Sequence, residues 1–291
     1  MKQVCKAIFF VFVGLFAAAQ EPVAPKVAIP LIVSGSHHRQ ANVTAQSLVI
    51  TDQKTPVAGA SLLRGADLPV ELGVLIDVSN SQRNALFADY FKATNQFVHD
   101  TIRGPEDRVF FLQFDSTPHA TGWLKKEQLP GTKFNVRIGG ATALYDALAM
   151  ACKERMGPRN WGKPTRRILV LISDGNDNLS HITHEEAALE ALRAGVVIFT
   201  INPFPFMVHQ GKNAMETFTK LTGGESFTQL VGNDVPKAFA SIQKMIDGMY
   251  FLSYVPPDGS KNALHEVEVK TAQKEKIQLS YAKKYFWNPS N

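Results

Sequence analysis

Between residues 70 and 250, short apolar runs alternate with longer amphipathic stretches. The runs at 72–76 and 168–172 contain almost no polar residue, which is typical of strands buried on both faces. In the stretch 82–102, by contrast, apolar residues recur along one helical face. The pattern predicts strands at 72–77, 109–114, 168–172 and 196–201 and a short strand that begins at 227. It predicts helices at 82–102, 142–156, 183–195, 212–221 and 234–249. This alternation predicts an α/β fold in which helices cover both faces of a mostly parallel sheet.

The two ends of the chain have a different pattern. Residues 31–66 hold short apolar runs separated by turn-forming residues, which indicates short strands. Near the other end, apolar residues alternate at period two over 267–269 and 277–281, which predicts an antiparallel hairpin. We expect the two strand-rich ends, 31–66 and 253–291, to pair into one small β domain.

The chain begins with the features of a targeting signal. Lys2 and Lys6 precede the apolar run 7–19, which is shorter than the roughly 20 residues that a helix needs to cross a bilayer. The basic start, the short apolar middle and the small residues before Ala19 predict a secretory signal peptide, residues 1–19. We therefore expect an exported protein, secreted or held in the periplasm or cell envelope, with no transmembrane span after cleavage.

Composition and charge narrow the class of protein further. The 291 residues are 45% apolar and 20% charged, which excludes a disordered chain. The formal net charge is +5, and the basic residues are scattered, so we expect no nucleic-acid partner. Cys5 lies in the predicted signal peptide, which leaves Cys152 with no partner for an internal disulfide. Its helical spacing from Leu144 and Leu148 predicts a buried, unreactive thiol.

Oxygen-bearing side chains gather where predicted strands end. Asp77, Ser79 and Ser81 directly follow one strand, Thr142 starts a helix after a Gly-Gly pair, and Asp174 follows another strand. In open α/β sheets, ligands bind beyond the carboxyl ends of the strands, so these three loops can converge. Hard oxygen donors without Cys or His suit Mg²⁺, with Mn²⁺ or Ca²⁺ as alternatives, better than Zn²⁺.

The order Asp-x-Ser-x-Ser, then Thr, then Asp-Gly resembles the metal-ion-dependent adhesion site (MIDAS) of the von Willebrand factor type A domain. All five family positions are filled here, by Asp77, Ser79, Ser81, Thr142 and Asp174. Asn80 stands where the family usually has a small residue, and its side chain need not ligate. The resemblance covers about residues 68–250 and implies a Rossmann-like fold. The flanks are similar to those of the exported bacterial group called VWFA-related (acidobacterial-type) proteins.

The resemblance also implies a domain plan. After the signal peptide, residues 20–66 form a Pro-rich leader and an N-terminal β segment. Residues 67–252 form the type A domain, and residues 253–291 form a C-terminal β-hairpin segment that pairs with the N-terminal one.

A binding mechanism follows from the same resemblance. Neutral hydroxyl oxygens and water leave the metal much of its positive charge, and an Asp or Glu carboxylate from a partner protein completes its coordination. The resemblance thus implies a metal-dependent protein-binding or adhesion module that is not an enzyme.

Other interpretations of the same residues stay open. Asp77 and Ser81 taken singly could cap the following helix. The chain could be a metal-free structural scaffold of the cell envelope, or, less favoured, a metal-dependent hydrolase. Against catalysis, the sequence has neither a Gly-x-Ser-x-Gly elbow nor a phosphate-binding Gly-x-x-x-x-Gly-Lys loop. A phosphotransferase built on a strand and Asp-x-Asp would need Asp where Ser79 stands.

Overall fold

A computed structural model shows how these segments are arranged. It describes residues 25–34, 43–82, 87–131, 137–202, 209–228, 230, 234–259, 263–272 and 277–288. The predicted signal peptide, residues 1–19, and the start of the predicted leader lie outside the described residues. Within the described ranges, every helix is too short or too polar to cross a bilayer.

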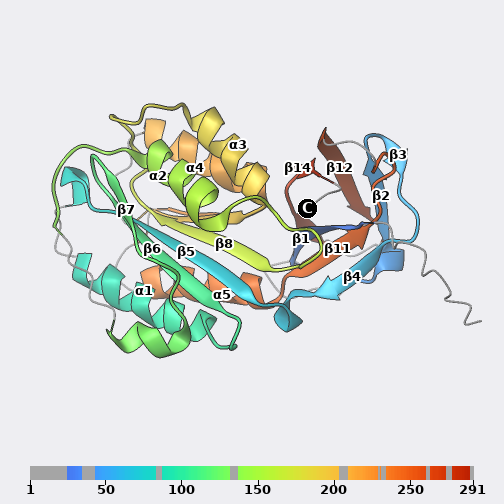
Figure 1. Ribbon diagram of the computed structural model, residues 1–291, viewed down its shortest axis with the longest axis horizontal. Helices are drawn as coiled ribbons and strands as arrows, with labels where there is room; N and C mark the ends of the chain where they lie inside the picture. The colour runs from blue at the N-terminus through green and yellow to red at the C-terminus, as the bar shows by residue number, and fades with distance from the viewer. Residues whose placement is uncertain are drawn as a thin grey trace, which may run out of the picture.

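A six-stranded sheet forms the centre of the larger body, in the order β10-β9-β8-β5-β6-β7 (Figure 1). All neighbours pair in parallel except β6 and β7, which are antiparallel. The strands are β5 (Val70–Asp77), β6 (Arg108–Phe114), β7 (Pro118–Ala120), β8 (Arg166–Ile172), β9 (Val197–Ile201) and β10 (Ser226–Phe227). The middle strands are buried on both faces, as their continuous apolar runs predict.

Helices cover both faces of this sheet. One face carries α1 (Phe87–Thr101) and α5 (Asp234–Asp247), and the other carries α2 (Leu144–Met150), α3 (His184–Ala194) and α4 (His209–Thr222) (Figure 1). The predicted Rossmann-like α/β class is therefore confirmed. A capping box starts α3, because the Thr183 hydroxyl accepts a hydrogen bond from Glu186 N–H and the Glu186 side chain accepts one from Thr183 N–H.

Two helix predictions differ in detail from the structure. In the helix predicted at 82–102, the structure describes α1 over Phe87–Thr101, residues 83–86 lie outside the described residues, and Gln82 belongs to a 3₁₀ turn, Asn80–Gln82. The helix predicted at 142–156 is α-helical to Met150 and continues as a π-helical turn, Ala151–Met156. Hydrophobic spacing does not distinguish these windings, because they keep nearly the same residues on the buried side. Cys152, in the π-helical turn, is buried as predicted.

Two antiparallel sheets built from the flanks form the smaller body. Their strand orders are β13-β1-β11-β4 and β14-β12-β2-β3. The strands are β1 (Val27–Ser34), β2 (Leu48–Asp52), β3 (Thr55–Pro56), β4 (Ser61–Arg64), β11 (Tyr250–Tyr254), β12 (Ala263–Thr271), β13 (Gln278–Ser280) and β14 (Lys284–Trp287). Each sheet combines strands from both ends of the chain, so the expected pairing of the flanks is confirmed. The boundary predicted between residues 252 and 253 lies inside β11.

The predicted C-terminal hairpin has a different partner strand. We expected 267–269 to pair with 277–281, but β12 pairs with β14, and β13 pairs with β1 in the other sheet. The reason is burial: β14 inserts Tyr285 and Trp287 into the core at 4% and 0% exposure. Alternation at period two identified these strands but does not identify their partners.

A buried polar cluster links the two flanking sheets. Asp52 of β2 is fully buried, and its carboxylate accepts hydrogen bonds from the hydroxyls of Tyr254 on β11, at 2.9 Å, and Tyr285 on β14, at 2.5 Å. Nδ1 of His265 on β12 lies 2.9 Å from the same carboxylate. A buried carboxylate is costly unless it is fully hydrogen-bonded, so these contacts favour one arrangement of the sheets.

We predict that Tyr285→Phe lowers the free energy of unfolding by about 1–3 kcal/mol, because it removes one hydrogen bond to a buried carboxylate and keeps the ring. Chemical denaturation measures the loss. Tyr250→Phe is the matched control, because the Tyr250 hydroxyl has no hydrogen bond within the described residues. Equal stabilities of the two variants would contradict a stabilising role of the Asp52 cluster.

Candidate metal site

Asp77 is the last residue of the central strand β5. The side chain is only 1% exposed, because β6 and β8 pair on either side of the strand. Its Oδ1 accepts a hydrogen bond from Ser79 N–H at 2.9 Å, and its Oδ2 accepts one from the Ser173 hydroxyl at 2.6 Å. Both oxygens of the carboxylate are therefore held in a fixed orientation.

The hydroxyls of Ser79 and Ser81 lie side by side. Their Oγ atoms are 3.1 Å apart, although one residue intervenes in the chain. Ser79 is buried and Ser81 is exposed. The buried Gln82 donates a hydrogen bond from Nε2 to Ser81 Oγ. The turn after β5 thus places two neutral oxygens together beside the Asp77 carboxylate.

Backbone hydrogen bonds join the second loop to the first. Gly139 N–H donates to the carbonyl of Val78 at 2.9 Å, and Asn80 N–H donates to the carbonyl of Gly140 at 3.2 Å. Gly140 has φ +77°, a conformation that a side chain would strain. The Gly-Gly pair therefore lets the loop that carries Thr142 lie directly against the loop that follows Asp77.

Thr142 is buried and anchored through its backbone. Its N–H donates to Asn178 Oδ1 at 2.9 Å, and its carbonyl accepts from the N–H groups of Asn178 and Leu179, both at 3.1 Å. The Thr142 side chain is 4% exposed, and its hydroxyl has no hydrogen bond within the described residues. This hydroxyl is thus available as a ligand.

Asp174 comes from the third loop and is partly exposed. Its Oδ1 accepts from Asn176 N–H at 3.0 Å, and its carbonyl accepts from Asn202 Nδ2 at 3.3 Å. Its charge is close enough to Asp77 to raise the pKa of that carboxyl. The two carboxylates therefore lie in the same small region at the sheet edge.

The pKa of Asp77 is raised from 3.8 to about 6. Burial is the main cause, and the charge of Asp174 adds to it, while the hydrogen bonds from Ser173 and Ser79 act in the opposite direction. Ionisation of Asp77 therefore costs more here than in water, and a nearby cation would offset that cost.

The donor set fits a hard divalent cation. The structure brings the loops of all five predicted ligands to one sheet edge, with two carboxylates and three hydroxyls among them. In the described part of the chain, no group of three or more His, Cys, Asp or Glu side chains could hold a metal. A site rich in hydroxyl oxygens suits Mg²⁺, Mn²⁺ or Ca²⁺. Ligation by these five residues stays a prediction.

The structure adds supporting residues that the sequence analysis did not identify. Ser173 orients Asp77 and also accepts a hydrogen bond from Gly175 N–H. Asn178 holds the backbone of Thr142. Ser173 directly precedes Asp174 and could have been suspected from its position, whereas Asn178 has no sequence signal because its contact is made across 36 residues of chain.

The comparison with protein families decides the classification. The model of the von Willebrand factor type A domain matches residues 71–234, which is more than half of the chain. The chain belongs to the von Willebrand factor type A family. The strands of the flanking sheets lie outside the matched residues.

Solved structures similar to this von Willebrand factor type A protein come from several bacteria. An aerotolerance-related membrane protein from Bacteroides fragilis is 17% identical, with a TM-score of 0.42, and covers 61% of this chain and 98% of its own. BatB from Bacteroides thetaiotaomicron is 17% identical, with a TM-score of 0.44, and covers 60% and 98%. A von Willebrand factor type A protein from Catenulispora acidiphila is 9% identical, with a TM-score of 0.46, and covers 92% and 75%. A search of curated proteins gave no match.

We predict that the Asp77 carboxyl makes the metal-free protein less stable as pH rises from about 4 to 6. The native state keeps this proton to a higher pH than the unfolded state, so the native state binds more protons in that window and loses stability with rising pH. A shift from 3.8 to about 6 corresponds to a loss of about 3 kcal/mol.

Chemical denaturation in EDTA at several pH values measures this dependence. Asp77→Asn should match the wild type near pH 4 and should be more stable above pH 6. A stability difference between the two proteins that does not change with pH would contradict the raised pKa.

Proposed function

We propose that this chain is an exported, divalent-metal-dependent protein-binding module of the adhesion type. Mg²⁺, or alternatively Mn²⁺ or Ca²⁺, would be held by Asp77, Ser79, Ser81, Thr142 and Asp174. The observation that carries the proposal is the pair of hydroxyls, Ser79 and Ser81, placed 3.1 Å apart beside the buried carboxylate of Asp77. Export rests on the predicted signal peptide, residues 1–19.

The residues of this chain would prepare the site before the partner arrives. Ser173 and the Ser79 N–H fix the Asp77 carboxylate, and Asn178 fixes Thr142. Three of the five donors are neutral hydroxyls, so a bound metal keeps positive charge with which to attract an Asp or Glu carboxylate of a partner protein. Because the donors are preorganised, little conformational freedom is lost when the metal binds.

Binding is a better match than catalysis for the groups near this site. The Ser79 and Ser81 hydroxyls are paired with each other, and the Asp77 carboxylate beside them is already held by the Ser173 hydroxyl and the Ser79 N–H. The thiol of Cys152 is 1% exposed, and burial raises its pKa, so it is unsuited to act as a nucleophile. We therefore propose that the chain is not an enzyme.

We predict that the wild-type chain takes up Mg²⁺ in isothermal titration calorimetry, and that Thr142→Ala weakens the uptake at least tenfold. The substitution removes one metal ligand, but the backbone contacts of Thr142 do not need its side chain. Thr117→Ala is the matched control: this exposed Thr lies two residues after Asp115, whose carbonyl holds Ala143 next to Thr142. Circular dichroism checks that both variants keep the fold.

A second titration tests carboxylate capture. In the presence of Mg²⁺, a short acetylated peptide with a central Asp should bind, and the same peptide with Asn should not. EDTA should abolish binding of the Asp peptide. Absence of Mg²⁺, Mn²⁺ and Ca²⁺ uptake by the folded wild type would favour the metal-free scaffold. Uptake without carboxylate capture would favour a different role for the metal.

A further inference from the structure

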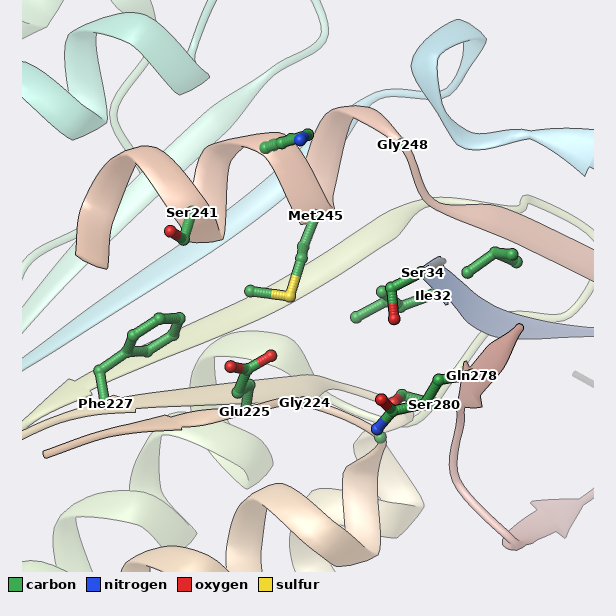
Figure 2. A pocket seen from close by; sticks show the side chains of 13 residues that line it. Ile32, Ser34, Gly224, Glu225, Phe227, Ser241, Met245, Gly248, Gln278 and Ser280 are labelled. Atoms are coloured by element: carbon green, nitrogen blue, oxygen red, sulfur yellow. The ribbon is translucent and has the colours of Figure 1, made fainter. Parts of the chain in front are cut away.

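A second candidate site lies where the larger and smaller bodies meet. It is a cavity of about 410 Å³ between α5 and β10 of the larger body and β1 and β13 of the smaller one (Figure 2). Its volume is within the range of small-molecule sites, which often lie at domain boundaries. Glu225, just before β10, and Phe227, at its end, line the cavity, and none of the five predicted metal ligands is among its described lining residues.

The first wall of the cavity is a stripe of α5. Ser241, Lys244 and Met245 of α5, with Gly248 just beyond its end, line the cavity at the helical spacing i, i+3, i+4, i+7. The opposite side of α5, which includes Ile242 and Ile246, packs into the core under the central sheet. The α5 helix therefore turns one face to the sheet and a second face to the cavity.

The other walls come from strands. Ile32 of β1 is paired with Ser280 of β13, and Ser34 is paired with Gln278, so these four side chains share one face. Figure 2 shows Met245 extending from α5 into the space between this face and the side chains of Glu225 and Phe227. The cavity thus has an apolar part, formed by Ile32, Phe227 and Met245, and polar groups around it.

Glu225 is the one carboxylate among the described residues that line this cavity, and its side chain is partly buried. The backbone of Glu225 is fixed, because its carbonyl accepts a hydrogen bond from Thr200 N–H at 3.1 Å. Within the described residues, the Glu225 carboxylate makes neither a hydrogen bond nor an ion pair. Lys244, the cationic residue of the described lining, is exposed and therefore lies at the rim.

We propose that this cavity binds a small organic ammonium compound, with the ammonium group on Glu225 and an apolar body between Phe227, Met245 and Ile32. A partly buried carboxylate gains most from a charged hydrogen-bond donor. The hydroxyls of Ser34 and Ser280 and the amide of Gln278 can accept or donate further hydrogen bonds to the ligand. The site is independent of the metal, and it needs β1 and β13, which lie outside the residues matched to the von Willebrand factor type A domain.

Three probes of similar shape and different charge test the proposal. Phenethylammonium is the cation, 2-phenylethanol is the neutral analogue, and 3-phenylpropanoate is the anion. The full chain, labelled with ¹³C at the methionine methyl groups, is titrated with each probe in EDTA, and Met245→Leu assigns the Met245 signal. We predict that the Met245 signal shifts with phenethylammonium at about tenfold lower concentration than with the alcohol.

Variants that each remove one charge then distinguish binding in the cavity from nonspecific binding elsewhere on the protein. Glu225→Gln should weaken phenethylammonium binding about tenfold and leave 2-phenylethanol unchanged. Lys244→Gln should not weaken phenethylammonium binding. Glu268→Gln is the matched control, because Glu268 is an exposed carboxylate of β12 outside the cavity. Circular dichroism checks the fold of each variant.

Four results would overturn the proposal: equal affinity for the cation and the alcohol, tighter binding of the anion, unchanged binding by Glu225→Gln, or no shift of the Met245 signal with any probe. Because EDTA is present throughout, these results do not depend on the candidate metal site. Failure of the metal-dependent function would therefore leave the proposed ammonium site untouched, and the reverse also holds.

Discussion

The constraint on which the site depends is the burial of β5 at the centre of a parallel sheet. Both edges of this strand are paired, and its apolar side chains are covered on both faces. The strand therefore carries Asp77 into a position that is 1% exposed, where ionisation of the carboxyl is unfavourable unless hydrogen bonds or a cation offset the lost hydration. Neighbouring parallel strands end at the same edge, so the loop of Asp174 follows from the same geometry.

Much of the fold could be predicted from the sequence, because a strand that is buried on both faces has a continuous run of apolar residues. Continuous apolar runs located β5, β8 and β9, and helical spacing located the helices between them. The pairing of strands in the flanks was harder. Period two marks β12 and β13 as strands, but the choice of β14 as partner depends on how Tyr285 and Trp287 fill the core, which is a property of the assembled sheets.

The candidate metal site likewise has residues that could be predicted from the sequence and residues that could not. The types and order of Asp77, Ser79, Ser81, Thr142 and Asp174 are visible in the sequence because each sits at a predicted strand or helix end. The residues that hold them are not visible. Ser173 acts on Asp77 from another strand, and Asn178 acts on Thr142 from another loop. Such contacts depend on the distances between loops in the folded protein, and these distances cannot be predicted from a single sequence.

The two bodies are joined by continuous packing as well as by the chain. In β1, Ala28 and Ile32 pack into the core of the larger body, while Val27 and Leu31 pack into the core of the flanking sheets. One strand thus contributes to both cores, since its alternate side chains point to opposite faces.

The end of α5 is tied into the same junction. The helix ends at Asp247, and Gly248 and Met249 connect it to β11; the Met249 carbonyl accepts a hydrogen bond from Gly65 N–H at 2.7 Å. A Cβ atom at Gly65 would lie 2.5 Å from that carbonyl oxygen, so the approach requires glycine. Because β11 is paired on both sides, by β1 and β4, a displacement of α5 along its axis would have to disturb a central strand of the flanking sheet. The flanking sheets therefore restrain α5, and the cavity lined by Met245 adjoins this junction.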